Sequence, residues 1–431
     1  MKKYDEYKDS GVAWIGEVPK HWEILRGKYV LKILSGFPFD SQKFEFEDNG
    51  VYMPLIRIRD INGSSTEVYY SGSYPIESVV KTGEVLIGMD GDFNISKWKG
   101  TNALLNQRVC KLREDSSMNT HYAFYMLSSP LKAINSVTYA TTVKHLSVYD
   151  IYNAFIPVPP ISEQAAISTY LDTHCAKIDN LISIQQKRIA LLQELKQSVI
   201  THAVTKGLNP NVEMKQSGVE WIGDVPKHWE VCKLKHYSQV FGRIGFRGYN
   251  QTDLVNEGEG AITLSPSNMQ NGILNYDKCS YLSWKKYYES PEIMIYNDDV
   301  LFVKTGSTYG KISYVADLPM EATINPQIVV FKNIKGNNKY LYYLLSNDIV
   351  QMQVSLTVGG STIPTLSQES ILNYIVPLAP KVEQAAIASY LDHKCATIDT
   401  SISNAQHQIE LLQEYKQSLI TEVVTGKYKV C

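Results

Sequence analysis

The chain has 431 residues, and at roughly 100–200 residues per domain this length predicts several domains rather than one globule. Hydrophobic residues make up 44% and charged residues 20%, which is typical of a folded, water-soluble protein and excludes disordered, collagenous and membrane-spanning classes. The formal net charge of −2 excludes a polycation. Nucleic-acid binding by this chain would therefore depend on local positive charge or on a partner.

The sequence carries no signal for export or membrane insertion. Its first six residues lack the apolar core of a signal peptide, and no uncharged apolar run approaches the ~20 residues of a membrane span. Six cysteines stand without CxxC spacing, which favours reduced thiols over a zinc site or a disulfide framework. We therefore expect a cytoplasmic protein.

In chain order, the first feature is a leading motif at residues 10–23, Ser-Gly-Val-Ala-Trp-Ile-Gly-Glu-Val-Pro-Lys-His-Trp-Glu. Short apolar runs at 85–88 and 108–112, separated by Gly, Asn, Asp and Ser, predict strands. Apolar residues at helical spacing predict a helix at 120–128. From 163 to 205 the chain has no Gly or Pro, which predicts one helix of about 65 Å.

The same order of elements then returns. The leading motif recurs at 217–230, apolar runs at 300–303 and 327–331 predict strands, and a helix is predicted at 339–346. A second long helix is predicted at 383–425. The leading motifs share 12 of 14 residues and the long helices 27 of 43, whereas the segments between them diverge. The chain is therefore two copies of one unit with a variable middle.

Both long helices carry the same heptad stripe of apolar residues, in steps of three and four. Its main members are Ile178, Ile182, Ile189, Leu192 and Val199 in the first helix, and Ile398, Ile402, Ile409, Leu412 and Leu419 in the second. Matching stripes make each helix the natural partner of the other, and a pseudo-two-fold relation between the units predicts antiparallel pairing. The alternative, in which each helix packs on its own domain, requires less length.

The predicted fold class is α+β, with two β-rich domains separated by a pair of long repeated α-helices that form an antiparallel coiled coil. We expect a first β-rich domain at 1–160 and a first helix at 161–207. A second β-rich domain is expected at 208–380 and a second helix at 381–431.

Motifs of catalysis do not occur in the sequence. Neither the Asp/Asn-Pro-Pro-aromatic motif of adenine and cytosine methyltransferases nor HExxH is present. The segment Gly-Ser-Thr-Tyr-Gly-Lys at 306–311 is one residue short of a phosphate-binding loop, and Ile312 replaces its Ser or Thr. We therefore expect no catalytic residue, no cofactor and no metal in this chain.

The remaining candidate site residues are basic and polar side chains in the variable middles. Arg57 and Arg59 alternate along 55–60, so both are expected on one face of a strand, opposite Ile56 and Ile58. The others lie in loops that contain Gly, Asn or Asp, or near short landmarks that recur in both halves, at 106–109 and 325–329 and at 142–147 and 362–367. They are Asn94, Lys97, Lys99, Gln107, Arg108, Lys144 and His145 in the first middle, and Arg243, Arg247, Tyr249, Lys304, Ser307, Tyr309, Lys311 and Gln327 in the second.

These residue types suit nucleic-acid recognition. Arg can bind guanine with two hydrogen bonds, Asn and Gln can bind adenine, and Lys contacts phosphate. A solvated surface side chain or a local salt bridge is the alternative for each residue taken alone. Clustering of such residues on loops in both copies favours the binding interpretation.

The whole arrangement resembles the specificity (S) subunit of type I restriction-modification systems. The resemblance is carried by Ser-Gly-Val-x-Trp-Ile-Gly-x-Val-Pro-x-His-Trp-Glu before each variable middle. It is also carried by the Pro-rich step into Glu-Gln-x-x-Ile at the start of each long helix. Ala379 departs from a Pro-Pro pair in the second copy.

The resemblance implies that each variable middle is a target recognition domain for one half of a bipartite site in double-stranded DNA. The helices would set the unread spacer and dock two modification (methyltransferase) subunits, which bind S-adenosylmethionine and methylate adenine. Two restriction subunits would add ATP-driven translocation and cleavage, and the S chain itself would catalyse nothing.

Three other function classes remain open at the level of sequence. A stand-alone pseudo-dimeric DNA-binding regulator would need no enzymatic partner. A scaffolding rod with two β-rich ends would bind proteins only. A fused nuclease or methyltransferase would need the motifs that are missing.

Overall fold

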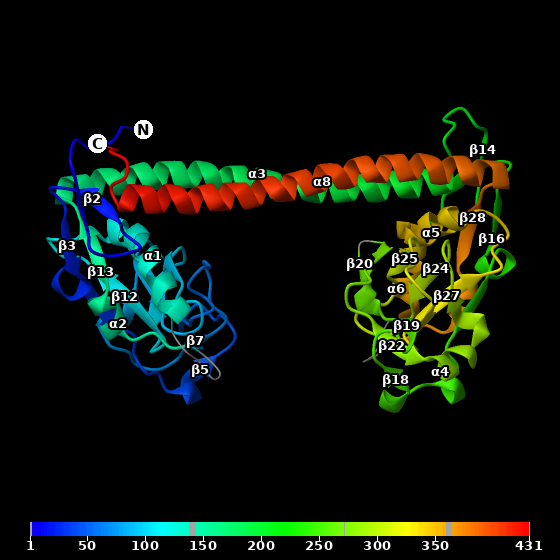
Figure 1. Cartoon of the computed structure of the whole chain (residues 1–431), viewed down its shortest axis with the longest axis horizontal. Coiled ribbons are helices and arrows are strands. Elements are labelled where there is room, and N and C mark those ends of the chain that lie inside the picture. Colours follow the sequence, from blue (N-terminus) through cyan, green and yellow to red (C-terminus); the bar gives the residue numbers. More distant parts are fainter. Residues whose placement is uncertain (1, 138–143, 271, 359–363, 431) are drawn as a thin grey trace. The chain divides into compact units, whose positions relative to one another are not determined.

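The computed structural model describes residues 2–137, 144–270, 272–358 and 364–430. They form two compact units (Figure 1). Unit 1 combines Met1–Gln185 with His407–Cys431, and unit 2 is Gln186–Gln406. Each unit therefore contains one variable middle and a part of both long helices.

The described part of unit 1 contains two larger, mainly antiparallel sheets and two two-stranded sheets, β1/β2 and β13/β3. The first sheet has the order β10-β9-β12-β4, and the second β5-β7-β6-β11-β8, in which β6 and β11 are parallel. Strands β13 and β3 pair beside the long helix. The elements are β1 (Tyr7–Asp9), β2 (Glu17–Pro19), β3 (Glu23–Arg26), β4 (Lys32–Ser35), β5 (Phe44–Glu45), β6 (Met53–Ile56), β7 (Tyr69–Tyr70), β8 (Val79–Val80), β9 (Val85–Gly88), β10 (Ile95–Lys97), β11 (Ala103–Leu105), β12 (Val109–Arg113), α1 (Thr120–Val137), α2 (Val148–Asn153) and β13 (Phe155–Val158).

Unit 2 repeats this topology although its sequence diverges. Its sheets have the orders β17-β27-β24-β25 and β18-β22-β19-β26-β23, with a parallel β19/β26 pair and a β16/β28 pair. The elements are β14 (Met214–Gln216), β15 (Asp224–Pro226), β16 (Glu230–Lys233), β17 (Gln239–Gly242), β18 (Leu254–Val255), β19 (Gly260–Leu264), β20 (Met269–Gln270), β21 (Ile273–Leu274), β22 (Ser280–Ser283), α4 (Trp284–Tyr288), β23 (Met294–Ile295), β24 (Val300–Val303), β25 (Ile312–Tyr314), β26 (Ala322–Ile324), β27 (Ile328–Lys332), α5 (Asn338–Ser346), α6 (Asp348–Val358), α7 (Gln368–Leu372) and β28 (Ile375–Leu378).

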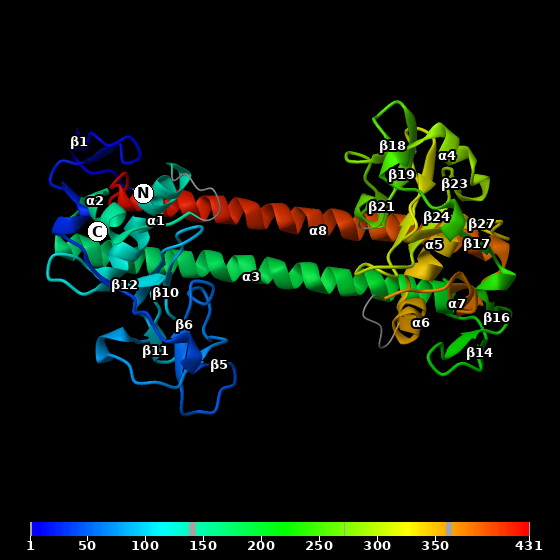
Figure 2. The ribbon, with the colours of Figure 1, turned by 90° about the horizontal axis from the view of Figure 1, so that it is seen from below.

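The long helices are α3 (Ile161–Lys206, 46 residues) and α8 (Lys381–Val424, 44 residues), about 69 and 66 Å at 1.5 Å per residue. They lie side by side in both views (Figures 1 and 2). In unit 1 the first half of α3 packs on the last part of α8, since Ile178 and Leu419 share one buried core. The predicted antiparallel coiled coil is thereby confirmed.

The heptad stripe faces the seam of this coiled coil. Ile178, Ile398 and Leu419 are buried, and the seven other apolar members of the stripe are half-buried, namely Ile182, Ile189, Leu192, Val199, Ile402, Ile409 and Leu412. Neighbours one residue off the stripe, such as Leu181 and Leu191, are 46% and 65% exposed. Burial of side chains along both helices therefore follows the 3.5-residue heptad period.

The leading motif joins the β-rich domain of unit 1 to the first turn of α3. Trp22 is fully buried, and its indole N–H donates to Glu163 Oε2 at 3.0 Å. Nε2 of His21 lies 2.7 Å from Glu163 Oε1. The neighbouring Gln164 is 1% exposed and accepts a hydrogen bond from the backbone N–H of Asn119, just before α1. These contacts of Trp22, His21, Glu163 and Gln164 fix the leading motif to the start of α3, and we call them the joint of unit 1.

Unit 2 has the same joint. The indole N–H of Trp229 donates to Glu383 Oε2 at 3.0 Å, and His228 Nε2 lies 2.6 Å from Glu383 Oε1. Gln384 accepts from the backbone N–H of Asn337, which caps α5. The near-identity of the two motifs is therefore explained by one set of buried contacts made twice.

Two local predictions differ from the structure. Strand β6 ends at Ile56 instead of continuing to residue 60, because the Asp60 carboxylate accepts from the backbone N–H of Arg57 and closes a turn. Arg57 and Arg59 therefore do not share a strand face. Helix α1 runs on past the predicted residue 128 to Val137 and contains Pro130.

None of the described helices has both the length and the apolar composition needed to span a membrane. In the same part of the chain, no group of three or more His, Cys, Asp or Glu side chains is placed to hold a metal ion. The five described cysteines are free thiols.

Candidate nucleic-acid interface

Three segments of unit 1 converge beside the end of β9. The backbone N–H of Met89, directly after β9, donates to Arg108 O at 3.0 Å, and Leu146 N–H donates to Met89 O at 2.7 Å. Gly91 N–H donates to Lys144 O at 3.0 Å. The loop 89–94, the turn 106–108 and the segment 144–146 therefore form one surface, which we call surface 1.

Unit 2 builds the same backbone frame. Lys304 N–H donates to Gln327 O at 2.8 Å, Leu366 N–H to Lys304 O at 2.8 Å, and Gly306 N–H to Pro364 O at 3.1 Å. We call the combination of 304–310, 325–327 and 364–366 surface 2. Asp90 pairs with His145 across surface 1 as Thr305 pairs with Thr365 across surface 2. Equivalent positions thus carry different side chains.

The shared frame shows which residues of the two turns correspond. Each turn begins with an Asn whose side chain accepts a backbone hydrogen bond, Asn106 from Gln107 and Asn325 from Gln327. Because the backbone of Arg108 bonds to surface 1 as that of Gln327 bonds to surface 2, the partner of Gln327 is Arg108 rather than Gln107. Counting from the strand that follows each turn gives the same pairing.

Surface 1 is charged. The Arg108 side chain is 56% exposed, with Nε 3.7 Å from Asp90 Oδ2. Nδ1 of His145, which is 54% exposed, lies 2.6 Å from the other oxygen of Asp90. Lys144 Nζ donates to the Asn135 backbone oxygen at 2.6 Å. Asn94 and Gln107 complete the surface with exposed side chains.

Surface 2 is more polar than charged. Gln327 and Ser307 are exposed, and Gln327 Oε1 accepts from Asn325 Nδ2 at 3.1 Å. Burial lowers the pKa of Lys304, which is half-buried at the base of the loop. Tyr309 and Lys311 are half-buried, and Tyr309 packs on the core of unit 2.

Arg57 and Arg59 lie outside surface 1, on the turn after β6. Arg57 Nε lies 3.2 Å from Asp60 Oδ2, and its Nη2 lies 2.8 Å from Glu67 Oε2. Burial opposes the charged form, but these two carboxylates outweigh it and raise the pKa of Arg57. Arg59 is 66% exposed and 3.7 Å from Glu67. Arg57 therefore stabilises the turn after β6, whereas the Arg59 side chain is exposed to solvent.

Lys97 on β10 ties the sheet of unit 1 to α3. Its Nζ lies 2.7 Å from Asp172 Oδ1 and 5.0 Å from the centre of the Phe124 ring. The same Asp172 oxygen accepts a hydrogen bond from the Tyr125 hydroxyl at 2.7 Å. Burial would raise the pKa of Asp172, but the hydrogen bonds from Lys97 and Tyr125 outweigh it and lower that pKa. Lys99, two residues on, is exposed.

Arg243 is buried, with 5% of its surface exposed. Its Nε donates to Ile324 O at 3.2 Å and its Nη2 to Thr323 Oγ1 at 3.1 Å, so it binds strand β26. The guanidinium lies 5.2 Å from the centre of the Tyr249 ring. Arg247 Nη1 lies 3.1 Å from Glu292 Oε1. This cluster holds the loop after β17 in place and leaves Arg243 no free face for a base.

Comparison with known proteins identifies the family. The sequence profile of the type I restriction modification DNA specificity domain matches this chain at residues 19–194 and 226–411. The chain is 27% identical over 417 residues to the type I restriction enzyme EcoBI specificity subunit of Escherichia coli, covering 94% of this chain and 86% of that protein. It is 25% identical over 420 residues to the MjaVIII specificity subunit of Methanocaldococcus jannaschii, covering 96% and 94%.

A solved structure has the same fold. It is a chain from work described as the structural basis of complex assembly and conformational transition of the type I R-M system, with a TM-score of 0.70 at 16% identity, covering 95% of this chain and 99% of that one. The chain therefore belongs to the family of type I restriction-modification DNA specificity subunits and carries the family's domain twice.

Proposed function

We propose that each unit of this specificity subunit reads one half of a bipartite site in double-stranded DNA. The observation that carries the proposal is the backbone frame shared by surfaces 1 and 2, which presents different side chains in the two units. One frame with two sets of side chains is what two different half-sites require. The target recognition domains would then be residues 1–160 and 208–380.

The side chains of the two surfaces suit different bases. The exposed guanidinium of Arg108 can form two hydrogen bonds with guanine, and the amide of Gln327 can form two with adenine. Lys144 on surface 1 and Lys304 on surface 2 stand beside them for phosphate contacts. Exposed Arg59 and Lys99 are further phosphate candidates on unit 1.

The coiled coil of 161–207 and 381–431 would set the length of the unread spacer. Two domains that read one face of B-DNA favour half-site centres about one turn, roughly 34–36 Å, apart. Helices of 46 and 44 residues are long enough to hold domains at that scale.

Two modification subunits would dock on the helices. The outer faces carry apolar side chains that no partner within the described part of the chain buries, with Leu191 and Leu195 in unit 2 matched by Leu411 and Tyr415 in unit 1. They are 49–65% exposed. One patch per unit fits two copies of one methyltransferase, and two restriction subunits would join the same complex.

Chemistry would reside in those partners. S-adenosylmethionine would bind the modification subunit, which methylates adenine, while this chain supplies no catalytic group, cofactor or metal. A net charge of −2 fits this division, since much of the phosphate contact would come from the partners. The complex would act in the cytoplasm, on chromosomal DNA.

The test is to express the chain with its methyltransferase partner, purify the complex and map methylated adenines across a genome. We expect a bipartite asymmetric site with an unread spacer. Tight sequence-specific binding by the chain alone at ~0.15 M salt would instead favour a stand-alone regulator. Failure to co-purify with the methyltransferase would overturn the proposal.

A further inference from the structure

The two joints between leading motif and long helix differ in one contact. In unit 1 the hydroxyl of Tyr4 donates to Glu163 Oε2 at 3.1 Å, beside the Trp22 N–H that donates to the same oxygen. Tyr4 is 9% exposed, and its ring centre lies 5.9 Å from Trp22 and 5.6 Å from His21. The phenol thus covers the carboxylate from outside.

In the described part of unit 2, no tyrosine hydroxyl bonds to the equivalent Glu383 carboxylate. Counting back from the leading motif, Asn211 stands where Tyr4 stands in unit 1; it is exposed, and its backbone N–H donates to Asn209 Oδ1. In the part of the chain that the structure describes, Glu383 Oε2 accepts only the Trp229 N–H. The Glu383 side chain is 40% exposed, against 19% for Glu163. One acceptor position is therefore open to a donor from outside.

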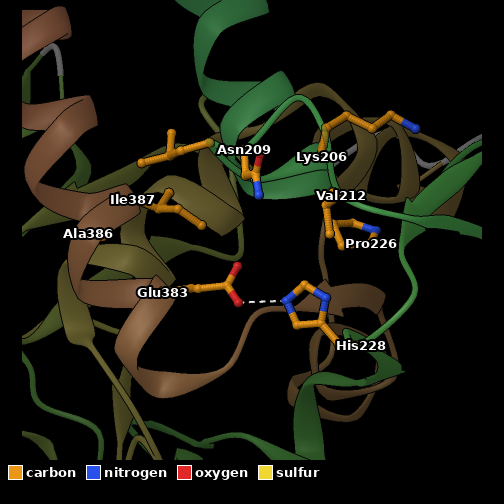
Figure 3. Close-up of a pocket in the computed structure, with 10 residues that line it drawn as sticks. Lys206, Asn209, Val212, Pro226, His228, Glu383, Ala386 and Ile387 are labelled. Carbon is orange, nitrogen blue, oxygen red and sulfur yellow. Dashed lines mark hydrogen bonds and ion pairs between the residues drawn. The ribbon is translucent and has the colours of Figure 1, made fainter.

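A cavity of about 290 Å³ lies beside Glu383 (Figure 3). Its walls come from the end of α3 and the loop after it, from β15 and from the first turns of α8. The apolar part of the lining is Leu208, Val212, Pro226, Ala386 and Ile387, and Lys206 and Asn209 also line it. Glu383 and His228 lie at one end of it and are joined by the 2.6 Å contact between Glu383 Oε1 and His228 Nε2. A cavity of about 150 Å³ is enough to hold a benzene ring. We call this cavity the Glu383 pocket.

We propose that the Glu383 pocket binds a tyrosine side chain of the methyltransferase subunit, which does in unit 2 what Tyr4 does in unit 1. The apolar walls would hold the ring, and the phenol hydroxyl would donate to Glu383 Oε2. This inference rests on the proposed function, in which that subunit docks on the helices.

The surface around the pocket connects it to the proposed docking face. A second hollow, of about 460 Å³, shares Gly207 and Leu208 with the Glu383 pocket and continues along Val199 and Tyr390. Leu195, 50% exposed, lies one turn of α3 before Val199. An apolar path therefore leads from the exposed leucines of α3 into the pocket.

In unit 1 the corresponding acceptor, Glu163 Oε2, is already bound by the Tyr4 hydroxyl. The hollow beside Glu163 has Tyr4 itself in its wall, and its other sides are charged, formed by Asp5, Glu6, Lys20 and Lys429. A tyrosine from a partner would find the acceptor already occupied there. Two identical methyltransferase subunits would thus be held by unequal contacts, with an added anchor on unit 2.

The test measures binding of the methyltransferase subunit to the full chain by native mass spectrometry and calorimetry. Ala386→Phe fills the pocket with a ring, and Asn211→Tyr supplies the phenol from the chain itself. We expect each variant to weaken one of two binding events about tenfold or more, because a hydrogen bond to a charged group is lost. Val382→Phe, one turn earlier in α8 at a site 85% exposed and outside the pocket, is the matched control and leaves both events unchanged.

The outcomes distinguish a failure of the proposed function from a failure of the pocket inference alone. If the wild-type chain binds no methyltransferase, both the proposed function and the pocket fail. If the wild-type chain binds it and both pocket variants bind equally well, only the pocket inference is wrong. Asn211→Tyr keeps the test valid if Ala386→Phe does not fold, since Tyr4 shows that this ring is accommodated in the equivalent joint.

A photo-cross-linking residue in place of Asn209, at the rim of the pocket, identifies the occupant within the assembled complex. We expect a cross-link to a tyrosine-containing peptide of the methyltransferase, and we expect Tyr→Phe at that position to reproduce the loss caused by Ala386→Phe. A cross-link to a second copy of this chain, or to a peptide without tyrosine, would contradict the proposal.

Discussion

Lys416 Nζ lies 2.6 Å from Asp179 Oδ1, and this ion pair joins the end of α8 to the first half of α3 within unit 1. Unit 2 holds its copy, Lys196 Nζ at 2.7 Å from Asp399 Oδ2. Across the repeat, Lys416 corresponds to Lys196, and Asp179 corresponds to Asp399. Each unit therefore holds the same ion pair between α3 and α8, and one antiparallel register of the helices satisfies both.

The seam of the coiled coil is expected to carry its stability. Ile178→Ala should lower the free energy of unfolding by about 2–4 kcal/mol, because this side chain is 5% exposed in the core that α3 and α8 share. Ile184→Ala, on the same helix but 48% exposed, should cost under about 1 kcal/mol. Urea unfolding followed by circular dichroism measures both. Equal losses would contradict the assignment of the seam.

Arg243 is expected to stabilise unit 2 rather than to read DNA. Arg243→Ala should destabilise the unit by about 2–3 kcal/mol, because Ile324 O and Thr323 Oγ1 each lose a charge-assisted hydrogen bond in a buried place. Thermal unfolding measures the effect, with Lys285→Ala, an exposed lysine of α4, as control. If the variant is as stable as wild type but no longer recognises its DNA site, Arg243 contacts DNA and the structural role is wrong.

The contact of Asp172 with Lys97 and Tyr125 predicts an acid-sensitive attachment of the domain to α3. Because the pKa of Asp172 is lowered below its usual 3.8 in the folded state, the contact stabilises folding above that value. This contribution should be lost as the pH falls below about 4 and through the folded pKa. Wild type should be more stable than Asp172→Asn at pH 7, with the difference shrinking in acid. A difference that widened on acidification would have the wrong sign.

Local signals in the sequence predicted the repeat, the two long helices and their antiparallel seam. Gly- and Pro-free stretches and a 3.5-residue period are read within single segments, and burial along the stripe follows that period. The sheets were not predictable in the same way, because the parallel β6/β11 and β19/β26 pairs join strands far apart in the chain.

The candidate site shows the same division. The loops of surfaces 1 and 2 could be found from repeated landmarks. Which of their side chains face outward depends on contacts in three dimensions that the sequence alone does not give. Arg57 is held by Asp60, which ends β6 early, and Arg243 is buried against β26. The counterpart of Gln327 became clear as Arg108 only when both backbone frames were compared. The Glu383 pocket had no sequence signal beyond the replacement of Tyr4 by Asn211.

The helices are expected to act as a ruler for the spacer. Removing one heptad from each, residues 186–192 and 406–412, shortens both by about 10 Å while keeping the stripe in phase. The recognised spacer should become shorter, with both half-sites retained. Methylation mapping of the variant complex checks this, and an unchanged spacer would show that the helices do not set the distance.

The central claim is that one chain reads two half-sites through two independent surfaces. The most direct measurement is a genome-wide map of methylated adenines for complexes that contain Arg108→Ala or Gln327→Ala. We predict that Arg108→Ala relaxes one half-site and Gln327→Ala the other, each by about 1–3 kcal/mol of base discrimination, with the spacer and the second half-site unchanged. Relaxation of both half-sites by either variant, or of neither, would contradict the account.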